Sequence, residues 1–437
     1  MASDIVTSRV FVDGEKGITA QKLNDIVASS VIQPAFYTSK PTAGTADPTD
    51  IALILKSGAY AQVPVSTLSG SATQAQIWST RLRSFNAIGN PTFEVDQRSA
   101  GASAGIAGIG NVQQIDRWLS LKAAAATMSG NVQQIAASPP ILLPGTSFAM
   151  TSKFWRVTLL TQQASLASTD FHALIQYPEG PQWRELSSDV HSISLLVRSS
   201  VAGLNFGVIL KDPTVTTKTL SKLCTIPAAN TWTLIQLPNL PLWPSGNFVT
   251  TPGANGYQFL IGLSAGSTQI SPANDTWQNG AFFGAAGQSN FAASPVNSTF
   301  DIAFVQHEPG SVCSTFIDKP FSQNLDECLR YYQKSYPYTT AIGTVSNIGM
   351  KTLICPIAGT LAYGPLSFLK PMAKLPTVTL YNNATGATGS VQDGGAVNHA
   401  GAVANAIGDS GFPSVGFTTA TTGPMAVNMH YTADTGW

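Results

Sequence analysis

The stretch from Asp301 to Tyr336, DIAFVQHEPGSVCSTFIDKPFSQNLDECLRYYQKSY, joins a long region rich in β-forming residues to a shorter one. It begins as a strand with alternating β-formers, and Pro309-Gly310 ends that strand. Ser322 is placed to cap a short helix. The apolar residues of this helix recur every three or four positions and share one face: Leu325, Cys328, Leu329 and Tyr332. The stretch therefore predicts a strand that closes one sandwich, a helix outside it, and entry into a second, smaller domain.

The same stretch resembles a known family. A Val-Gln-x-Glu-Pro-Gly motif spans residues 305–310, and Lys319-Pro320-Phe321 and then the run Cys328-Leu329-Arg330-Tyr331-Tyr332 follow it. This order resembles the distal part of bacteriophage tail-fibre and appendage proteins, with His307 where that family more often has Leu. Tyrosines on a helix that faces a sheet usually bury their rings, so the Arg-Tyr-Tyr triplet is interpreted as packing, and a ligand site there is the alternative.

The composition limits both the architecture and the partners. The 437 residues are enough for two to four domains, and only 11% are charged, which favours many short strands and turns over long solvated helices. Lys plus Arg equals Asp plus Glu at 23 each, so no strong field exists to hold nucleic acid. The N-terminus lacks the pattern of a signal peptide, and no apolar run is long enough to span a bilayer. We expect assembly in a host cytoplasm, with no nucleic-acid binding and no membrane insertion.

The sequence lacks the common catalytic and metal-binding patterns. The four cysteines lack metal-ligand spacing, the five histidines lie far apart, and no nucleophile elbow, HExxH or P-loop occurs. A polysaccharide-cleaving enzyme needs only two facing carboxylates, and the candidates are Glu179, Glu185 and Asp189 near Trp183, and Asp275 beside Trp277. We expect no enzyme, no cofactor and no metal site, with hydrolysis as the alternative.

Residues 1–70 predict a compact mixed α/β unit. A strand over 5–12, a helix over 20–29 and a hairpin bending at Lys56-Ser57-Gly58 follow from the local patterns. This unit is similar to the N-terminal domain that fixes some phage fibres and spikes to the virion. The similarity implies attachment through apolar residues of the helix and of the segment after it: Leu23, Ile26, Val27, Phe36 and Tyr37.

Residues 71–89 predict a helical linker with Ile77, Trp78, Leu82 and Phe85 as its apolar positions. A tryptophan on so short a helix between domains would be poorly covered in a monomer. The linker therefore forms either a trimeric helix bundle or a helix packed on its own neighbour, and both alternatives stay open.

Residues 90–310 predict a jelly roll. A strand over 90–98, NPTFEVDQR, answered by Asp116-Arg117-Trp118, resembles the opening of the carbohydrate-binding-module-like jelly roll of the same appendage proteins. We expect Asp116 to pair with Arg98 or Arg117, and Trp118 to fill the core. The peptide GNVQQI occurs at 110–115 and again at 130–135, and is interpreted as two related turns.

The remaining strands are predicted from short β-rich runs between Gly, Pro and Asn clusters. In the jelly roll they are 154–163, 191–200, 203–212, 218–226, 231–238, 256–265 and 298–306. Residues 311–338 are a connecting turn and helix. Residues 339–437 predict a small distal β-sandwich with strands at 350–357, 376–382 and 424–433, and with a long tract of loops over 382–411. The fold class is thus mainly β, with a jelly-roll sandwich followed by a second sandwich.

Aromatic residues in loops are suited to sugars, because a pyranose face stacks on an aromatic ring. The predicted exposed candidates are Trp183, Trp243, Tyr257 and Trp277, whereas Trp155 and Trp232 lie within strands and belong to the core. The alternative is that each aromatic residue pins a loop onto the sandwich.

These features predict a bacteriophage virion protein, a homotrimeric fibre or spike subunit. Its N-terminal domain would bind a head, portal or tail protein of the phage, and its outer domains would adsorb to a host surface polysaccharide. A head or tail decoration protein that binds no receptor, and a polysaccharide depolymerase, are the alternatives.

Overall fold

The computed structural model describes residues 51–56, 59–64, 85–106, 110–123, 126–213, 218–316 and 318–437. The chain divides into two compact units, Met1–Trp78 and Ser79–Trp437. In the first unit, strands β1 (Ile51–Lys56) and β2 (Ala59–Pro64) pair antiparallel with Lys56 opposite Ala59, which confirms the predicted hairpin. The other predictions for this unit lie outside the described residues, as does most of the predicted linker: Leu23, Ile26, Val27, Phe36, Tyr37, Ile77, Trp78 and Leu82.

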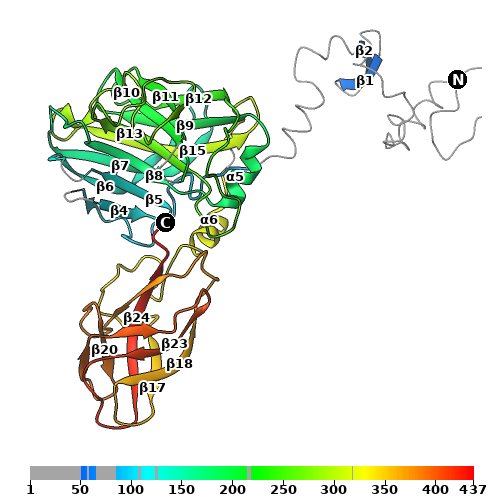
Figure 1. Cartoon of the computed structure of the whole chain (residues 1–437). Coiled ribbons are helices and arrows are strands. Elements are labelled where there is room, and N and C mark those ends of the chain that lie inside the picture. Colours follow the sequence, from blue (N-terminus) through cyan, green and yellow to red (C-terminus); the bar gives the residue numbers. More distant parts are fainter. Residues whose placement is uncertain are drawn as a thin grey trace, which may run out of the picture. The chain divides into compact units, whose positions relative to one another are not determined.

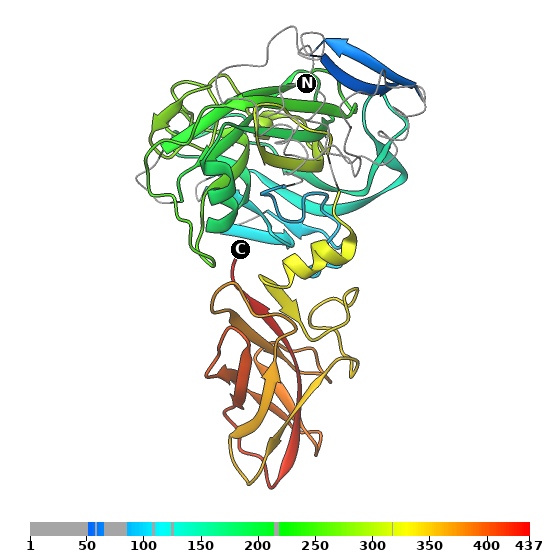
Figure 2. The ribbon, with the colours of Figure 1, turned by 90° about the vertical axis from the view of Figure 1, so that its right-hand side faces the viewer.

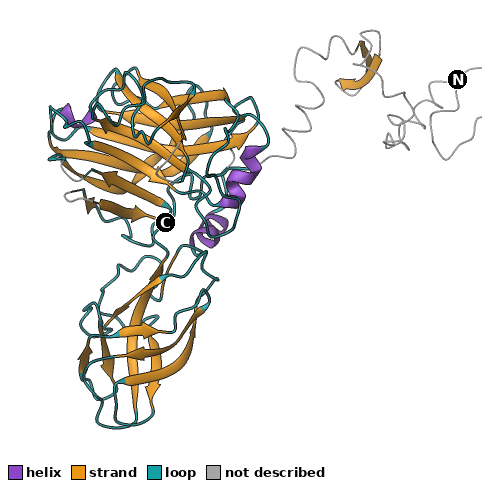
Figure 3. Ribbon diagram, viewed as in Figure 1, coloured by secondary structure: helices purple, strands orange, loops and turns teal. Residues whose placement is uncertain are grey.

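The second unit contains a larger sandwich of two antiparallel sheets (Figures 1 and 3). In order across the seven-stranded sheet lie β14 (Trp277–Asn279), β11 (Lys218–Ile226), β10 (Leu204–Lys211), β13 (Gln258–Ala265), β8 (Phe171–Gln176), β5 (Trp118–Lys122) and β4 (Gly110–Ile115). In order across the six-stranded sheet lie β12 (Thr233–Leu240), β9 (His191–Ser199), β15 (Thr299–Pro309), β7 (Ala149–Thr161), β6 (Ser129–Leu142) and β3 (Ala104–Gly105). The predicted jelly-roll sandwich is confirmed, with all seven predicted strands present.

Helices are few in the part of the chain that the structure describes. They are α5 (Gly180–Ser187), α6 (Phe321–Cys328) and the short 3-10 helix η1 (Phe291–Ala293). Neither α-helix is long and apolar enough to cross a membrane.

An aromatic core lies between the two sheets. Trp118 and Trp155 are at most 1% exposed and their ring centroids are 6.0 Å apart, while Phe93 lies 5.1 Å from Trp118. Alternate residues of each strand point into this core, as expected for a pleated sheet with one face buried. The predictions of Trp118 and Trp155 as core residues are confirmed. The same prediction for Trp232 is wrong, because Trp232 lies just before β12 and packs, partly exposed, on the outer apolar cluster of the six-stranded sheet.

The segment 90–98 is not the predicted strand. It is a chain of turns in which Asn90 and Phe93 have positive φ angles of 47° and 58°. The two GNVQQI peptides are not turns either, since the first forms β4 and the second begins β6. The fifth residue of each repeat holds the 90–102 segment in place: Gln134 Nε2 donates to Phe93 O at 2.6 Å, and Gln114 Nε2 donates to Ala102 O at 3.2 Å.

The predicted ion pair of Asp116 is also wrong in detail. Asp116 is buried and accepts from the backbone N–H of Gln97 at 2.6 Å, whereas Arg98 forms a two-pronged ion pair with Asp434. Arg117 lies 3.5 Å from the ring centroid of Tyr331. The arginines therefore contact the C-terminal part of the chain, which the local sequence pattern could not indicate.

Each outer face of the larger sandwich carries its own apolar cluster. On the six-stranded sheet, Phe154, Leu196 and Phe304 are covered by Phe316, whose ring stacks on Phe304 at 4.3 Å. On the seven-stranded sheet, Ile209 and Leu260 are buried with other apolar residues, and Phe283 packs against them.

The connecting segment leaves β15 at Pro309, as predicted. Helix α6 begins at Phe321 with Pro320 at its N-cap, so the prediction of Ser322 as the cap is wrong. Tyr332 is not on the helix but begins β16 (Tyr332–Lys334). The packing interpretation of the Arg-Tyr-Tyr triplet is confirmed for its tyrosines, since Tyr331 and Tyr332 are buried beneath Arg117 and Arg98.

The small domain is built around β24 (Met425–Asp434), which runs along it in Figures 1 and 2. Its other strands are β16, β17 (Lys351–Cys355), β18 (Leu361–Ser367), β19 (Thr377–Tyr381), β20 (Ser390–Asp393), β21 (Asn398–Ala400), β22 (Val403–Asn405) and β23 (Gly411–Gly416). The first half of β24 pairs with β17 and β20, and its second half with β16 and β19. The predicted distal strands are confirmed, but the tract 382–411 contains three further strands.

Candidate functional site: an aromatic cluster beside α5

The four aromatic residues predicted to bind sugar come together around Trp243. Trp183 of α5, Tyr257 before β13 and Trp277 of β14 have ring centroids 6.3, 5.2 and 5.3 Å from that of Trp243. Phe248 joins them, stacked on Trp183 at 5.2 Å with an interplanar angle of 7°. We call Trp183, Trp243, Phe248 and Trp277 the aromatic cluster.

Local backbone geometry fixes the loop 241–256 against α5. Pro181 occupies the first turn of α5, where its missing N–H costs no helical hydrogen bond. Gly180 lies so close to the backbone of Thr250 and Thr251 that a Cβ would collide with both. A glycine is therefore required where the helix starts, and the loop that carries Trp243 and Phe248 packs directly on it.

Burial divides the predicted residues into two groups. Tyr257 is fully buried, so the expectation that it is exposed is wrong and it cannot contact a ligand directly. Trp183, Trp243 and Trp277 are partly exposed. Their three indole N–H groups have no hydrogen-bond partner among the described residues. A buried donor without an acceptor is costly, so the cluster retains unused polar capacity.

A chain of hydrogen bonds lies beneath the cluster. Tyr257 Oη contacts His307 Nδ1 at 2.7 Å, His307 Nε2 contacts His191 Nδ1 at 2.9 Å, and His191 Nε2 contacts the carbonyl of Pro241 at 3.2 Å. Because a carbonyl only accepts, His191 Nε2 must carry a proton and its Nδ1 must accept. His307 then donates through Nε2 and accepts from the hydroxyl of Tyr257.

Burial keeps this chain uncharged at neutral pH. It lowers the pKa of His191 to about 4 and holds the pKa of His307 well below its usual value, while the pKa of Tyr257 lies well above its usual value. His191 also stacks on Trp243 with ring centroids 4.9 Å apart. The neutral histidines thus lie beneath Trp243, and the stacked ring of His191 fixes the orientation of its indole.

The carboxylates that would serve a hydrolase have other partners. Glu179 is buried and accepts from the Tyr331 hydroxyl and from Gly253 N. Asp275 pairs with Lys222, and Glu185 lies 3.2 Å from Arg184. Among the described residues, no group of three or more His, Cys, Asp or Glu side chains could hold a metal ion.

The prediction missed Phe248, His191 and His307 as members of this region. Phe248 is an isolated aromatic residue in a loop rich in Pro, Gly and Asn, where no periodicity marks it. One histidine lies on β9 and the other on β15, and only the register between these two strands brings them together.

Comparisons with known proteins give partial similarities. No family model and no curated protein matches the chain. A proposed sugar-binding protein from Bacteroides thetaiotaomicron VPI-5482 matches 52% of this chain and 100% of its own, with 9% identity and a TM-score of 0.28. The module TmCBM61, solved with β-1,4-galactotriose, matches 51% and 98%, with 11% identity and a TM-score of 0.24.

A third similar structure is the family 11 carbohydrate-binding module of the cellulosomal cellulase Lic26A-Cel5E of Clostridium thermocellum. It matches 47% of this chain and 98% of its own, with 12% identity and a TM-score of 0.24. The architecture of the present chain rests on its own two sheets, described above. The place of the protein in a bacteriophage virion stays a prediction.

Proposed function

We propose that the protein is a non-enzymatic, glycan-binding subunit of a bacteriophage fibre or spike. The observation that carries the proposal is the aromatic cluster, in which three partly exposed tryptophans from separate segments meet around Trp243. A pyranose stacks its C–H face on an aromatic ring and needs polar groups for its hydroxyls. The three indole N–H groups are buried and unpartnered, so a sugar hydroxyl that reached one of them would satisfy a donor that the protein leaves without an acceptor.

We infer self-association from an exposed apolar face of the small domain. Eleven of the nineteen exposed large apolar side chains among the described residues lie in the small domain. Four of them share one face of its sheet, which we call the apolar face: Ile354, Leu361, Tyr363 and Val403, each 40–57% exposed. Ile354 is the direct cross-strand partner of Tyr363. An exposed apolar sheet face of this kind marks an interaction site, and a homotrimer would cover it.

Several copies would make weak sugar contacts useful. A single site with a Kd of about 1 mM corresponds to about 4 kcal/mol, but linked copies bind with a raised effective concentration. The N-terminal residues would attach the trimer to a head, portal or tail protein, as their resemblance to phage attachment domains implies. The protein would then act in the virion after assembly in the host cytoplasm.

The test is binding of the labelled full-length protein to host cells and to host surface polysaccharide, together with competition against intact phage. Substituting both Trp183→Ala and Trp277→Ala should reduce binding at least tenfold. Trp437→Ala is the matched control, because Trp437 is also partly exposed but packs elsewhere, beneath Lys374. Melting curves confirm that each variant is folded.

Three results would contradict this function. Failure of the wild-type protein to bind cells or to compete with phage would favour a decoration protein. New reducing ends in the polysaccharide would identify a depolymerase. Unchanged binding by the double tryptophan variant would leave the cluster with a packing role only.

A further inference from the structure

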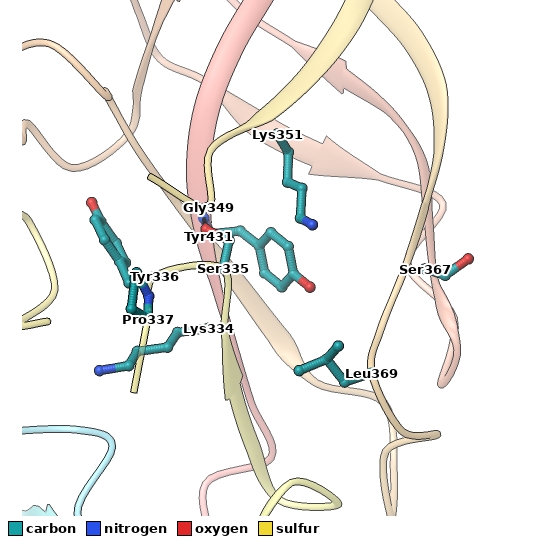
Figure 4. A pocket seen from close by; sticks show the side chains of 9 residues that line it. All are labelled: Lys334, Ser335, Tyr336, Pro337, Gly349, Lys351, Ser367, Leu369 and Tyr431. Atoms are coloured by element: carbon teal, nitrogen blue, oxygen red, sulfur yellow. Dashed lines mark hydrogen bonds between the residues drawn. The ribbon is translucent and has the colours of Figure 1, made fainter. Parts of the chain in front are cut away.

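A hollow lies in the small domain, away from the aromatic cluster. It has a volume of about 260 Å³ and lies between β16, β17, β18 and β24 (Figure 4). Its lining includes Lys334, Tyr336, Lys351, Ser367, Leu369 and Tyr431. We call it the small-domain pocket.

The pocket exists because β24 changes partners along its length. Along β24, the pairing with β17 stops at Met429, which lies opposite Lys351, and the pairing with β16 starts at Thr432, which lies opposite Lys334. Tyr431 lies between these two pairings. Its backbone N–H donates to Ser335 Oγ at 3.0 Å, and its carbonyl accepts from Ser335 N at 3.0 Å. The side chain of Tyr431 therefore stands at a gap between the paired strands.

Strand register places Lys351 and Tyr431 on the same side of the sheet. Tyr431 is two residues beyond Met429, the partner of Lys351, so the two side chains are diagonal neighbours across β17 and β24. Figure 4 shows the ammonium end of Lys351 and the hydroxyl end of Tyr431 turned toward the side where Leu369 and Ser367 lie. Tyr336 and Lys334 point away from that side.

The two lysines of the lining differ in their availability. Lys334 is buried, and its Nζ donates to the carbonyls of Gln97, Tyr338 and Thr340 at 2.7, 2.9 and 2.7 Å. All three of its protons are used. No hydrogen bond or ion pair is found for Lys351 Nζ among the described residues, and no lining residue is acidic. The pocket thus has a positive character with one available ammonium group.

Apolar surface completes the site. Leu369 is 70% exposed at the pocket, although its backbone is fixed by a hydrogen bond from its N–H to Gln333 Oε1 at 2.7 Å. The ring of Tyr431 is anchored in the core of the domain against Phe368 and Phe412. An ammonium, a hydroxyl and an apolar wall on rigid strands suit a ligand with a carboxylate and a C–H face.

We propose that the small-domain pocket binds a carboxylate-bearing sugar, one hexuronic acid residue of an acidic surface polysaccharide. Lys351 pairs with the carboxylate, and Leu369 packs on the C–H face. Tyr431 is only 2% exposed, so it meets the ligand through its hydroxyl alone, which bonds to the carboxylate or to a ring hydroxyl. The volume lies just below the lower end of drug-sized pockets, about 300 Å³, which suits one sugar ring with its neighbours left in solvent. The proposal rests on the glycan-binding function and names the ligand class of a second site.

The test is titration of the full-length protein with methyl glucuronide, methyl glucoside and inorganic phosphate, followed by NMR shifts or calorimetry. We expect the glucuronide to bind at least tenfold more tightly than the glucoside, and added salt to weaken it. Lys351→Gln should abolish this preference. Tyr431→Phe, which keeps the packed ring, should weaken glucuronide binding several-fold. Lys370→Gln is the matched control, because Lys370 pairs with Asp326 and does not line the pocket.

Three outcomes would overturn the proposal. They are equal affinity for glucuronide and glucoside, full glucuronide binding by Lys351→Gln, and phosphate binding as tight as glucuronide, which would show a simple anion site. Cell binding separates this failure from failure of the function. If binding to host cells still depends on Trp183 and Trp277 but the pocket does not bind methyl glucuronide, the proposed function stands and only the proposal for this site is wrong.

Discussion

The two sandwiches of this chain follow the same inward alternation but treat their outer faces differently. The larger sandwich covers an outer apolar cluster with its own chain, since Phe316 of the connecting segment stacks on Phe304. The small domain covers its core equally well, with Leu353, Val427 and Met429 at most 2% exposed. Its outer face nevertheless shows Ile354 and Tyr363 to solvent.

The difference shows which outer apolar faces the chain covers with its own residues. In the small domain, which the structure describes throughout, the strands next to Ile354 and Tyr363 place only uncharged residues on the outer side: Thr352, Ser414, Asn405, Ala426 and Asn428. A solvated sheet face normally carries charges. The larger sandwich therefore covers the apolar cluster on that outer face with its own chain, whereas we expect the apolar face of the small domain to be covered by other copies.

The largest expected effect concerns the ion cluster on the outer face of the larger sandwich. Asp301 is buried and accepts from both Arg156 and Arg198, which are its direct partners on the neighbouring strands. Asp301→Asn removes the charge that both guanidinium groups need. We expect a loss of about 3 kcal/mol in the free energy of unfolding, at the lower end for broken buried pairs because both arginines are partly exposed.

Chemical denaturation of the full-length protein measures this loss. Asp326→Asn is the control, because Asp326 forms an exposed pair with Lys370 and should cost about 0.5 kcal/mol or less. Equal losses in the two variants would contradict the view that the larger sandwich is stabilised by its own buried outer face.

The next effect is a pH dependence of the larger sandwich. Burial lowers the pKa of His172 and of His191 to about 4, against about 6.5 in the unfolded chain. The unfolded state therefore binds more protons between pH 6.5 and pH 4, and stability falls as pH falls through this window. We expect each histidine to cost on the order of 2 kcal/mol between pH 7 and pH 5.

A variant of opposite sign sharpens this measurement. Burial raises the pKa of Asp116 to about 7, so its native state gains protons as pH falls, which offsets part of the histidine loss. His191→Gln should make the loss on acidification smaller, and Asp116→Asn should make it larger. Thermal melts at pH 7 and pH 5 test both variants. A change in stability between the two pH values that equals that of the wild type would contradict the shifted pKa values of His191 and Asp116.

The smallest effect on folding, but a large one on assembly, is expected at the apolar face. Ile354→Ser with Tyr363→Ser should change the stability of the isolated subunit by about 0.5 kcal/mol or less, because both side chains are exposed. The proposed wild-type assembly is a trimer in solution mass measurements, and the same variant should be a monomer. Leu375→Ser is the control, since Leu375 is 68% exposed outside this face. A wild-type monomer, or a variant that remains trimeric, would count against the homotrimer.

Strand positions were predictable where alternation is strong and uninterrupted. The run KTLSKLCTI matches β11 from end to end, and Pro309-Gly310 marks the end of β15. The prediction of a strand over 90–98 was wrong because the backbone of this segment is held by distant groups, such as Gln134 of β6, rather than by a partner strand. The prediction of turns at the GNVQQI peptides was wrong because their inward-facing residues include glutamines, which interrupt the alternation of apolar and polar residues. Gln114, for example, is buried and accepts a hydrogen bond from Trp155.

The candidate sites were predictable residue by residue but not as constellations. Trp183, Trp243 and Trp277 were singled out as loop aromatics, yet their convergence depends on the packing of α5 and loop 241–256. Nothing local separates the buried Tyr257 from its partly exposed neighbours, because Tyr257 packs against Trp243 and bonds to His307, which lie far away in the sequence. Lys351 had no sequence signal, since its pocket arises from the partner change of β24.

That partner change has a mechanical consequence. β24 belongs to both halves of the small domain, and Asp434 at its end is clamped to Arg98 of the larger sandwich. In the proposed virion fibre, a pull on a sugar held in the small-domain pocket would put tension along β24 and load its ladder hydrogen bonds in parallel, as shear, rather than opening them one at a time. β24, which shapes the pocket, would then also transmit the drag force between the host surface and the larger sandwich.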